Sequence, residues 1–378
     1  MNKSCKNNSN KSNLYLFLNP GETLKTWEDR GYLCREIKYY KKLKSVFPRV
    51  SWITYSKSED SPIISNISSI KILSNKKNSP KKAYIKEIHN QISAYKNELC
   101  VLKTNQLASA FETLKISRKF NLPLVIRCGN FRNYWIHRQG IIEKVKVWLK
   151  LKIAIHYSKI LMVPTIEEAT FAKTLFKIKD EKIKIVPNFV NTEIFKPKSD
   201  MSKHRDICFV GSFKPAKNLT NLILSLESIN GVKLTLIGDG PEKESLAILA
   251  NSIGVEIEFL GRLENESLPQ ILNSSQYFAF PSLYEGNPKA LLEAMACGLP
   301  VITTPVYGIK NIINHMQNGY LCKDTTSTSI RETIIAAMNS QELNKTISIN
   351  ARNTITKNYS IESVLKKEIG IYKELELI

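Results

Sequence analysis

The hydrophobic positions along the first half of the chain alternate between two periods. Short, mostly apolar runs occur at residues 14–20, 50–56 and 122–128, and such runs predict buried strands. Residues 32–47 and 141–159 instead repeat apolar positions every three or four residues, which predicts helices. Strands that alternate with helices in this way predict a parallel, doubly wound sheet.

The second half repeats the pattern more clearly. Residues 206–212, 232–241 and 255–261 each combine an apolar run with a glycine-bearing end, as expected of a strand that leads into a turn. Helices are predicted between and after these strands, including one at residues 309–316 and an amphipathic one at residues 360–378. The second half therefore predicts another parallel, doubly wound sheet.

A polar stretch punctuated by prolines, PNFVNTEIFKPKSD, predicts a linker near residue 198. Two α/β domains of similar size on either side of it predict a ligand in the cleft between them, outside the carboxyl ends of the strands. The predicted division is a disordered polar tail (1–13), an N-terminal domain (14–198), a C-terminal domain (199–355) and a C-terminal helix (356–378) that packs back on the N-terminal domain.

Composition narrows the class of protein. Hydrophobic residues make up 43% of the 378-residue chain and charged residues 24%, as in globular proteins, and no apolar run has the length that spans a bilayer. The first twelve residues lack the apolar region of a signal peptide. Seven cysteines without a CxxC pair predict free thiols in a reducing cytoplasm. Five scattered histidines, without HExxH or HxH spacing, predict that no metal is bound.

The positive charge is concentrated in the first half. Residues 1–200 contain 38 Lys and Arg against 16 Asp and Glu, a net charge of +22, whereas residues 201–378 contain 17 against 18, a net charge of −1. An AT-rich coding sequence would enrich the chain in lysine, but it would do so in both halves. The asymmetry favours a first half that faces something anionic, such as a membrane surface, a lipid phosphate or an acidic glycan.

The stretch PSLYEGNPKALLEAMACGLPVITT (281–304) predicts a loop, a short helix and a buried strand. Asn287 is a suitable N-cap, Pro288 suits the first turn, and Gly298 suits the left-handed position after the helix. A helix start of this kind favours a phosphate, and the carboxylates of Glu285 and Glu293 are suited to accept hydrogen bonds from sugar hydroxyls beside it. Two glutamates eight residues apart are, by spacing alone, better explained as solvated surface charges.

Four glycine-bearing strand ends precede or include this stretch: FVGSFKPAKN (209–218), LIGDGP (236–241), FLGRL (259–263) and PSLYEGNPK. In a parallel sheet all four emerge at one edge, where glycine allows a flat base or a diphosphate to approach the backbone. Lys214 and Lys217 follow the first of these strands and are placed to reach phosphate oxygens. Strand–glycine turns are common one at a time, but four in this order form a specific pattern.

Together these segments resemble a known family. PNFVNTEIFKP, FVGSFKPAKN, LIGDGP, FLGR and above all EGNPKALLEAMACGLPVI resemble the retaining glycosyltransferases of family 4, the glycosyl transferases group 1. The resemblance spans roughly residues 14 to 375 and is specific beyond about residue 185. It implies the GT-B fold: two Rossmann-like doubly wound parallel-sheet domains with an inter-domain cleft, the N-terminal one on the acceptor side and the C-terminal one binding a nucleotide sugar.

The resemblance also implies roles for particular residues. Glu285 and Glu293 form the family's E-x7-E motif, in which Glu293 binds the ribose of the donor and Glu285, a catalytic candidate, contacts the transferred sugar. The implied donor-binding residues are Gly211, Lys214, Lys217, Gly238, Asp239, Gly240, Gly261, Arg262, Gly286, Asn287, Pro288, Lys289 and Glu293. Ser212 stands where the family usually has arginine, so one forked donor to the diphosphate is lost, and Lys214 is the candidate substitute.

Three residues of the N-terminal domain are further candidates. Arg127 ends a predicted strand and would stabilise the departing phosphate as a catalytic residue, although a plain ion pair explains it equally well. Gly31 would lie at a backbone turn near the donor, or would simply allow the chain to enter a helix. His137 is a cleft candidate, for which a surface or packing role is the simpler explanation. The lysines and Trp148 of residues 141–152 would seat a helix on a membrane, or form a solvated face.

These observations predict a retaining hexosyltransferase that moves a hexose from a UDP- or GDP-sugar to an acceptor glycan or lipid-linked glycan in envelope polysaccharide synthesis. No cofactor and no metal are expected, because the helix dipole and the lysines would hold the leaving diphosphate. The expected place is the cytoplasm, with peripheral binding to the inner face of the membrane.

Three alternatives stay open. A nucleotide-sugar epimerase of the same fold would bind the same donor without an acceptor, and a catalytically inactive subunit would explain Ser212. A nucleic-acid-binding protein would explain the basic half, but the sequence has no RNP-like aromatic motif and no zinc-finger spacing, so nucleic acid is not an expected partner.

Overall fold

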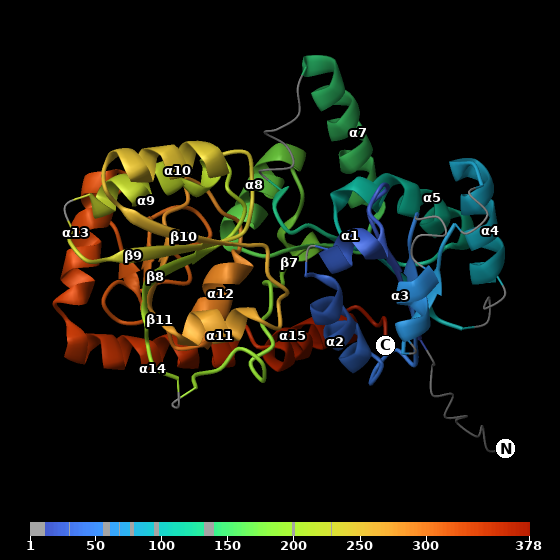
Figure 1. Cartoon of the computed structure of the whole chain (residues 1–378). Coiled ribbons are helices and arrows are strands. Elements are labelled where there is room, and N and C mark those ends of the chain that lie inside the picture. The colour runs from blue at the N-terminus through green and yellow to red at the C-terminus, as the bar shows by residue number, and fades with distance from the viewer. Residues whose placement is uncertain are drawn as a thin grey trace, which may run out of the picture. The chain divides into compact units, whose positions relative to one another are not determined.

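The computed structural model describes residues 12–29, 31–55, 61–67, 69–75, 79–93, 98–131, 140–198, 201–227 and 229–378. The predicted polar tail lies almost entirely outside these residues. The chain divides into two compact units, of which the first comprises residues 1–186 and 365–378 and the second residues 187–364 (Figure 1). The chain therefore returns to its first unit at the end.

The first unit contains a seven-stranded sheet in which neighbouring strands pair in parallel, in the order β3-β2-β1-β4-β5-β6-β7. Its strands are β1 (Asn13–Phe17), β2 (Arg49–Ile53), β3 (Lys71–Leu73), β4 (Cys100–Thr104), β5 (Leu124–Arg127), β6 (Ile160–Val163) and β7 (Ile183–Ile185). Its helices are α1 (Leu24–Asp29), α2 (Leu33–Leu43), α3 (Ser61–Asn66), α4 (Lys81–Ser93), α5 (Ala110–Phe120), α7 (Ile141–Tyr157), α8 (Ile166–Phe176) and most of α15 (Ile361–Glu374).

The second unit contains a six-stranded parallel sheet in the order β10-β9-β8-β11-β12-β13. Its strands are β8 (Arg205–Val210), β9 (Lys233–Ile237), β10 (Glu256–Gly261), β11 (Ser275–Phe280), β12 (Val301–Thr303) and β13 (Tyr320–Leu321). Its helices are α9 (Leu219–Leu226), α10 (Lys243–Ser252), α11 (Leu268–Asn273), α12 (Lys289–Ala296), α13 (Ser327–Met338) and α14 (Gln341–Asn358).

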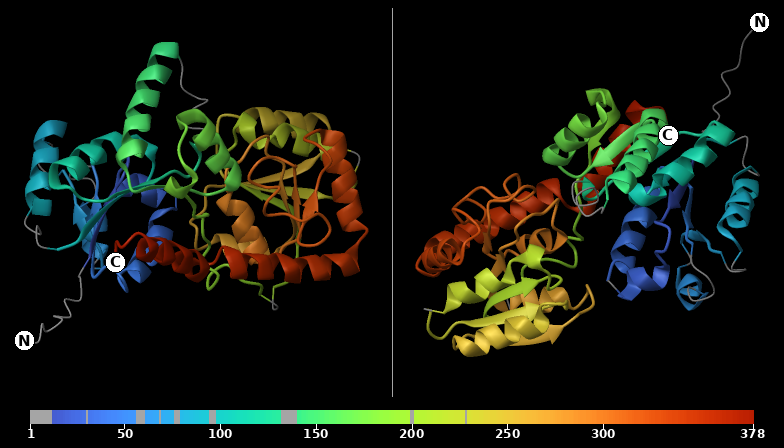
Figure 2. Two further views of the ribbon diagram at one scale, coloured as in Figure 1. Left: turned by 180° about the vertical axis from the view of Figure 1, so that it is seen from behind. Right: turned by 90° about the horizontal axis from the view of Figure 1, so that it is seen from above.

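Both sheets are doubly wound, as predicted. Helices lie on both faces of the second sheet, with α9 and α10 on one side and α11 and α12 on the other (Figures 1 and 2). Strands buried on both faces must be apolar on both faces, which explains why the sequence shows continuous apolar runs instead of alternation. The strand order of the second sheet reverses between β8 and β11, and ligands of such sheets bind outside the carboxyl ends of the strands at this point.

The helix predicted at residues 309–316 is not formed, and that prediction was wrong. Residues 307–312 form turns, and the short strand β13 follows at Tyr320. Gly308 has a φ of 79°, which does not belong to a helix, and Asn318 accepts a hydrogen bond from the Asn314 N–H and donates to the Ile312 carbonyl. Local side-chain bonds of this kind compete with helical backbone bonds.

The described part of the chain contains no helix that is long and apolar enough to cross a membrane.

A buried ionic cluster fastens α15 to the first unit. The side chains of Lys103 and Glu368 are both fully buried and form an ion pair, and the hydroxyls of Tyr39 and Tyr372 donate to the Glu368 carboxylate at 2.7 and 2.5 Å. Burial alone would raise the pKa of Glu368, but Lys103 and Arg127 hold it below its ordinary value. The cluster therefore holds a charged carboxylate inside the unit by surrounding it with donors.

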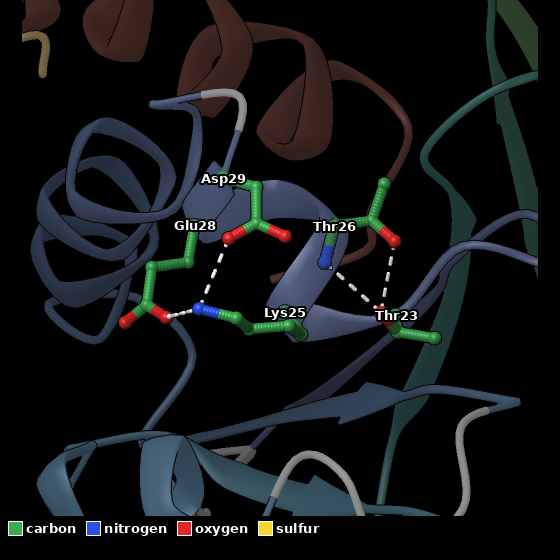
Figure 3. Close-up of polar contacts among 5 residues, drawn as sticks. All are labelled: Thr23, Lys25, Thr26, Glu28 and Asp29. Atoms are coloured by element: carbon green, nitrogen blue, oxygen red, sulfur yellow. Dashed lines mark hydrogen bonds and ion pairs between the residues drawn. The ribbon is translucent and has the colours of Figure 1, made fainter. Parts of the chain in front are cut away.

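The exposed ion pairs of α1 provide a contrast within the same unit (Figure 3). Lys25 lies 3.0 Å from Glu28 and 3.0 Å from Asp29, and about half of each side chain is exposed. The hydroxyl of Thr23 accepts the Thr26 N–H at 2.9 Å beside them. Exposed pairs contribute little because water already solvates both charges.

We expect Glu368→Gln to lower the free energy of unfolding by about 3–5 kcal/mol, because the buried Lys103 ammonium loses its counter-charge. Denaturant titration of the full chain measures the loss of unfolding free energy, and calorimetry measures the melting temperature. The double variant Lys103→Met with Glu368→Gln should recover much of it, since no unpaired charge from this ion pair remains. Lys25→Met is the exposed control and should leave the melting temperature nearly unchanged. A loss for Glu368→Gln no larger than that of the control would contradict this account.

Candidate functional site

The loops that follow β8, β9, β10 and β11 all leave the same edge of the second sheet, as the parallel pairing requires. Hydrogen bonds join them to one another. The Leu283 N–H donates to the Ala216 carbonyl at 2.9 Å, and the Asn218 amide donates to the Pro281 carbonyl at 3.1 Å and to the Thr325 carbonyl at 2.9 Å. The predicted convergence of these four strand ends is therefore confirmed.

Gly238 and Gly240 allow the loop after β9 to lie directly against the loop after β8. A Cβ atom on Gly238 would lie 1.8 Å from the Gly211 carbonyl oxygen, and one on Gly240 would lie 2.3 Å from the Phe213 carbonyl oxygen. The Phe213 N–H donates to the Asp239 carbonyl at 3.0 Å. The glycines of LIGDGP are therefore required by contact between two loops, whatever ligand the loops approach.

Gly261 and Arg262 continue the same edge at the end of β10. Gly261 has a φ of 68° and accepts a hydrogen bond from the Gly238 N–H at 2.7 Å. The Arg262 guanidinium lies 3.9 Å from the Asp239 carboxylate, and both side chains are more than half exposed. This pair forms an exposed border of the edge.

Lys217 and Glu285 form an ion pair at this edge, with side chains 20% and 12% exposed. Lys217 ends the 3₁₀ helix Pro215–Lys217, and its ammonium also lies 4.9 Å from the centre of the Phe280 ring. The two candidates therefore hold each other in place in a largely buried position. Lys214 is exposed, and its N–H donates to the Ser212 carbonyl at 3.1 Å.

Glu293 lies on α12 and is only 5% exposed. Its Oε1 accepts a hydrogen bond from the Asn265 side-chain amide at 3.1 Å. A carboxylate this deeply buried is not the solvated charge that the spacing of the two glutamates allowed. The ammonium of Lys289, at the start of the same helix, lies 5.7 Å from the centre of the Phe189 ring.

Asn287 does not cap α12, and the prediction of its capping role was wrong. The helix begins at Lys289, with Pro288 in the N-cap position and no side-chain cap bond. The Asn287 side chain instead accepts the Asn188 N–H at 2.7 Å, while the Asn188 amide donates to the Asn287 carbonyl at 2.6 Å. This reciprocal pair fixes the Gly286–Pro288 loop to the segment that enters the second unit.

The end of α12 agrees with the prediction for Gly298, which has a φ of 71°. Gly298 N–H donates to the Met295 carbonyl and Leu299 N–H to the Ala294 carbonyl, the pair of bonds that closes a helix at a left-handed residue. The Arg352 guanidinium donates a hydrogen bond to another carbonyl at the end of this helix, that of Ala296, at 2.8 Å.

Two positioning residues were missed by sequence reasoning. Gly308 lies so close to the Glu285–Asn287 loop that a Cβ atom would be 1.7 Å from the Gly286 carbonyl oxygen. The isolated glycine of VYGIK was the available signal, but only a helix beginning at the next residue was predicted. Arg352 bonds the carbonyls of Thr192, Phe195 and Ala296 from α14, and nothing in its local sequence indicated this.

The remaining candidates belong to the first unit. Arg127 is 6% exposed, and its pKa is raised despite burial because Tyr40, Glu36 and Glu368 stabilise the charge. Gly31 has a φ of 66° and closes α1, since its N–H donates to the Glu28 carbonyl and that of Tyr32 to the Trp27 carbonyl. Local geometry thus accounts for both residues, and their roles toward a donor stay predictions. His137 lies outside the described residues.

No group of three or more His, Cys, Asp or Glu side chains in the described residues is arranged to hold a metal ion.

Comparison with solved structures identifies the class of fold. The structure of HepE from Anabaena, solved in complex with UDP, superposes with a TM-score of 0.78 over 96% of this chain and 100% of that one, at 15% identity. The two doubly wound parallel sheets are those of the GT-B fold, which confirms the predicted fold class.

The sequence comparison finds a family match in the second half of the chain. Residues 190–354 match the family model of the glycosyl transferases group 1, and this region contains the whole edge described above. The predicted resemblance is thereby confirmed.

Two curated relatives indicate the range of the family. The chain is 26% identical over 230 residues to the N-acetyl-alpha-D-glucosaminyl L-malate synthase of Bacillus anthracis, which covers 57% of this chain and 60% of that one. It is 24% identical over 316 residues to the UDP-Gal:alpha-D-GlcNAc-diphosphoundecaprenol alpha-1,3-galactosyltransferase of Escherichia coli, covering 77% of this chain and 80% of that one. The match thus spans less than two thirds of the first relative and more of the second.

We expect Gly308→Ala to destabilise the second unit more than Gly254→Ala. Both glycines have a positive φ, which costs an alanine about 1–2 kcal/mol, but only at Gly308 would the new Cβ atom meet backbone. Gly254 has no heavy atom within 4 Å of its Cβ position and is the matched control. Denaturant unfolding measures both variants, and equal losses would contradict the close approach of Gly308 to Gly286.

Proposed function

We propose that this chain is a nucleotide-sugar-dependent glycosyltransferase whose donor binds at the carboxyl edge of the second sheet. The observation that carries the proposal is the placement of a cation and two carboxylates at the edge where the strand order reverses. Lys217 and Glu285 are paired there, and Glu293 is buried on α12. The family match over residues 190–354 supports a glycosyl donor as the ligand.

We propose a UDP-hexose as the first donor to test, with a GDP-hexose second. The HepE structure was solved with UDP, and another structure of that protein contains UDP-glucose. The name of the Escherichia coli relative includes UDP-galactose and a diphosphoundecaprenol-linked sugar. These names support a UDP-sugar donor and a glycan or lipid-linked glycan acceptor, of the kind used in cell-envelope glycan synthesis.

In this proposal each polar group has one task. The Lys217 ammonium and the N-terminus of α12 would bind the diphosphate, where free N–H groups and the helix dipole favour negative charge. Glu285 would leave its ion pair with Lys217 in part, to accept a hydroxyl of the transferred sugar. Glu293 would accept the ribose hydroxyls. Ser212 offers no charge to the diphosphate, so Lys214 would supply the second cation.

The proposed reaction retains the anomeric configuration. The bond between the anomeric carbon and the diphosphate oxygen breaks while the acceptor hydroxyl forms a bond on the same face of the sugar. The leaving diphosphate takes the hydroxyl proton, so the products are the glycoside and a nucleoside diphosphate. Stabilisation of that diphosphate by Lys217 and the helix start is the main electrostatic contribution of the protein, and no metal or cofactor enters the proposal.

Incubation of the chain with a panel of UDP- and GDP-sugars tests the proposal. Release of nucleoside diphosphate, slow with water and faster with an added glycan acceptor, is the expected result, and NMR of the product then reports its anomeric configuration. Conversion of the donor to its epimer without release would replace the proposal with an epimerase. Donor binding without any turnover would support an inactive subunit.

We expect Glu293→Ala to weaken binding of the bare nucleoside diphosphate by about 1.5–3 kcal/mol, because a charged acceptor of ribose hydroxyls is lost. Calorimetric titration measures the affinity, and a melting curve shows that the variant is folded. Glu342→Ala, an exposed glutamate of α14, is the control. Unchanged affinity in the folded Glu293 variant would remove this residue from the donor site.

We expect Lys217→Ala to weaken binding of the nucleoside diphosphate much more than binding of the unphosphorylated nucleoside, because the lysine is assigned to the phosphates alone. The same titrations with Lys345→Ala, an exposed lysine of α14, provide the control. Equal losses for both ligands would show that Lys217 acts on the fold of the edge instead of on the diphosphate.

A further inference from the structure

Helix α7 (Ile141–Tyr157) carries apolar side chains on two opposite faces, of which one is packed and the other is exposed. The packed face contains Leu151, Ala154 and Ile155, all buried. Trp148 belongs to the packed face, since its indole N–H donates to the Leu175 carbonyl at 3.0 Å. Trp148 is therefore not part of the exposed face of this helix.

The exposed face, called here the α7 apolar face, consists of isoleucine, valine and leucine side chains on successive turns. Their exposed fractions are 81% for Ile141, 73% for Ile142, 50% for Val145, 47% for Leu149 and 40% for Ile153. Residues three or four apart on a helix lie on the same side, so these side chains form one row. Single exposed apolar residues are ordinary, but a contiguous row marks an interaction surface.

The exposure rises steadily toward the N-terminal end of α7. That end of the helix extends beyond the neighbouring elements of the first unit, whereas its C-terminal half lies beside α5 (Figure 1). The Arg118 guanidinium of α5 covers the ring of Tyr157, the last residue of α7, at 4.5 Å. The most exposed part of the face is therefore its first turn, which contains Ile141 and Ile142.

Basic side chains flank the α7 apolar face. Lys146, Lys150 and Lys152 are exposed, and Lys144 is partly buried. None of the ion pairs between described residues includes any of these four lysines. The Lys152 ammonium lies 4.5 Å from the centre of the Trp148 ring, so its stem lies along the helix and its charge stays at the surface.

An apolar row between lysines matches one kind of partner. The hydrocarbon side chains are suited to the acyl boundary of a bilayer, and the ammonium groups are suited to the phosphates above it. A second copy of this chain is a poorer match, because a symmetric contact through this face would bring the same lysines together. An acidic glycan would satisfy the lysines and leave the isoleucines exposed to water.

We propose that the α7 apolar face and its lysines dock on the surface of a bilayer that contains anionic phospholipid. The helix lies on the surface, with Ile141, Ile142 and Val145 entering the acyl boundary and Lys146, Lys150 and Lys152 binding lipid phosphates. This docking belongs to the first unit and does not depend on the donor proposed for the second.

Flotation of the full chain with vesicles tests the proposal. The protein should bind vesicles of phosphatidylcholine mixed with phosphatidylglycerol and should not bind vesicles of phosphatidylcholine alone. Replacing Ile142, Val145 and Leu149 with glutamine should weaken binding about tenfold or more, and so should replacing Lys144, Lys146, Lys150 and Lys152 with glutamine. Added salt should weaken the binding of the intact chain.

Matched control variants distinguish binding through the α7 apolar face from nonspecific hydrophobic or electrostatic binding. Replacing Ile248, Ile335 and Ile349, exposed isoleucines on helices of the second unit, with glutamine should leave vesicle binding unchanged. Replacing the exposed Lys310, Lys323, Lys345 and Lys357 with glutamine removes the same amount of charge from the second unit. Nucleoside diphosphate affinity, measured on every variant, should not change, so failure of docking and failure of the proposed donor site give different results.

Three outcomes would overturn the proposal. The first is no binding to anionic vesicles at low salt. The second is vesicle binding that survives the three glutamine substitutions on the α7 apolar face, which would leave only a general attraction of charge. The third is a dimer of the intact chain in light scattering that the same substitutions dissociate, which would make a second copy the occupant of this face.

Discussion

Direct contact between backbone segments at the carboxyl edge of the second sheet is the constraint on which the candidate site depends. The loop after β9 lies against the loop after β8 through Gly238 and Gly240, and Gly308 lies against Gly286 in the same manner. No side chain larger than hydrogen fits at these contacts. The glycines therefore determine where Lys217, Glu285 and Glu293 come to lie, although none of them carries a reactive group.

The polar groups of the edge then stabilise one another. Lys217 is held between the Glu285 carboxylate and the Phe280 ring, Glu293 is bonded by Asn265, and Asn287 is bonded by Asn188. Groups held in this way lose little freedom when a ligand binds, which lowers the entropic cost of binding. In the proposed function, an anionic ligand would take the place of the Glu285 carboxylate beside the Lys217 ammonium.

Much of the fold and part of the site followed from the sequence. Continuous apolar runs such as residues 14–20 and 206–212 predicted strands correctly because both faces of a parallel strand are buried. The segment 309–316 was mistaken for a helix because periodicity does not report hydrogen bonds made by side chains such as that of Asn318. The reciprocal bonds of Asn188 and Asn287, and the contacts of Arg352, join residues far apart in the chain, and no local pattern encodes such contacts.

The ion pair of Lys103 and Glu368 has a consequence for how the protein is made. Its two partners are 265 residues apart, and the whole second unit lies between them in the chain. During synthesis Lys103 therefore emerges long before the carboxylate that neutralises it. The first unit therefore stays incomplete, with Lys103 unpaired at a core position and the packing site of α15 uncovered, until the second unit has been translated. The second unit is one continuous segment and can fold in the meantime. Although the first unit begins to emerge first, it is the last to be completed.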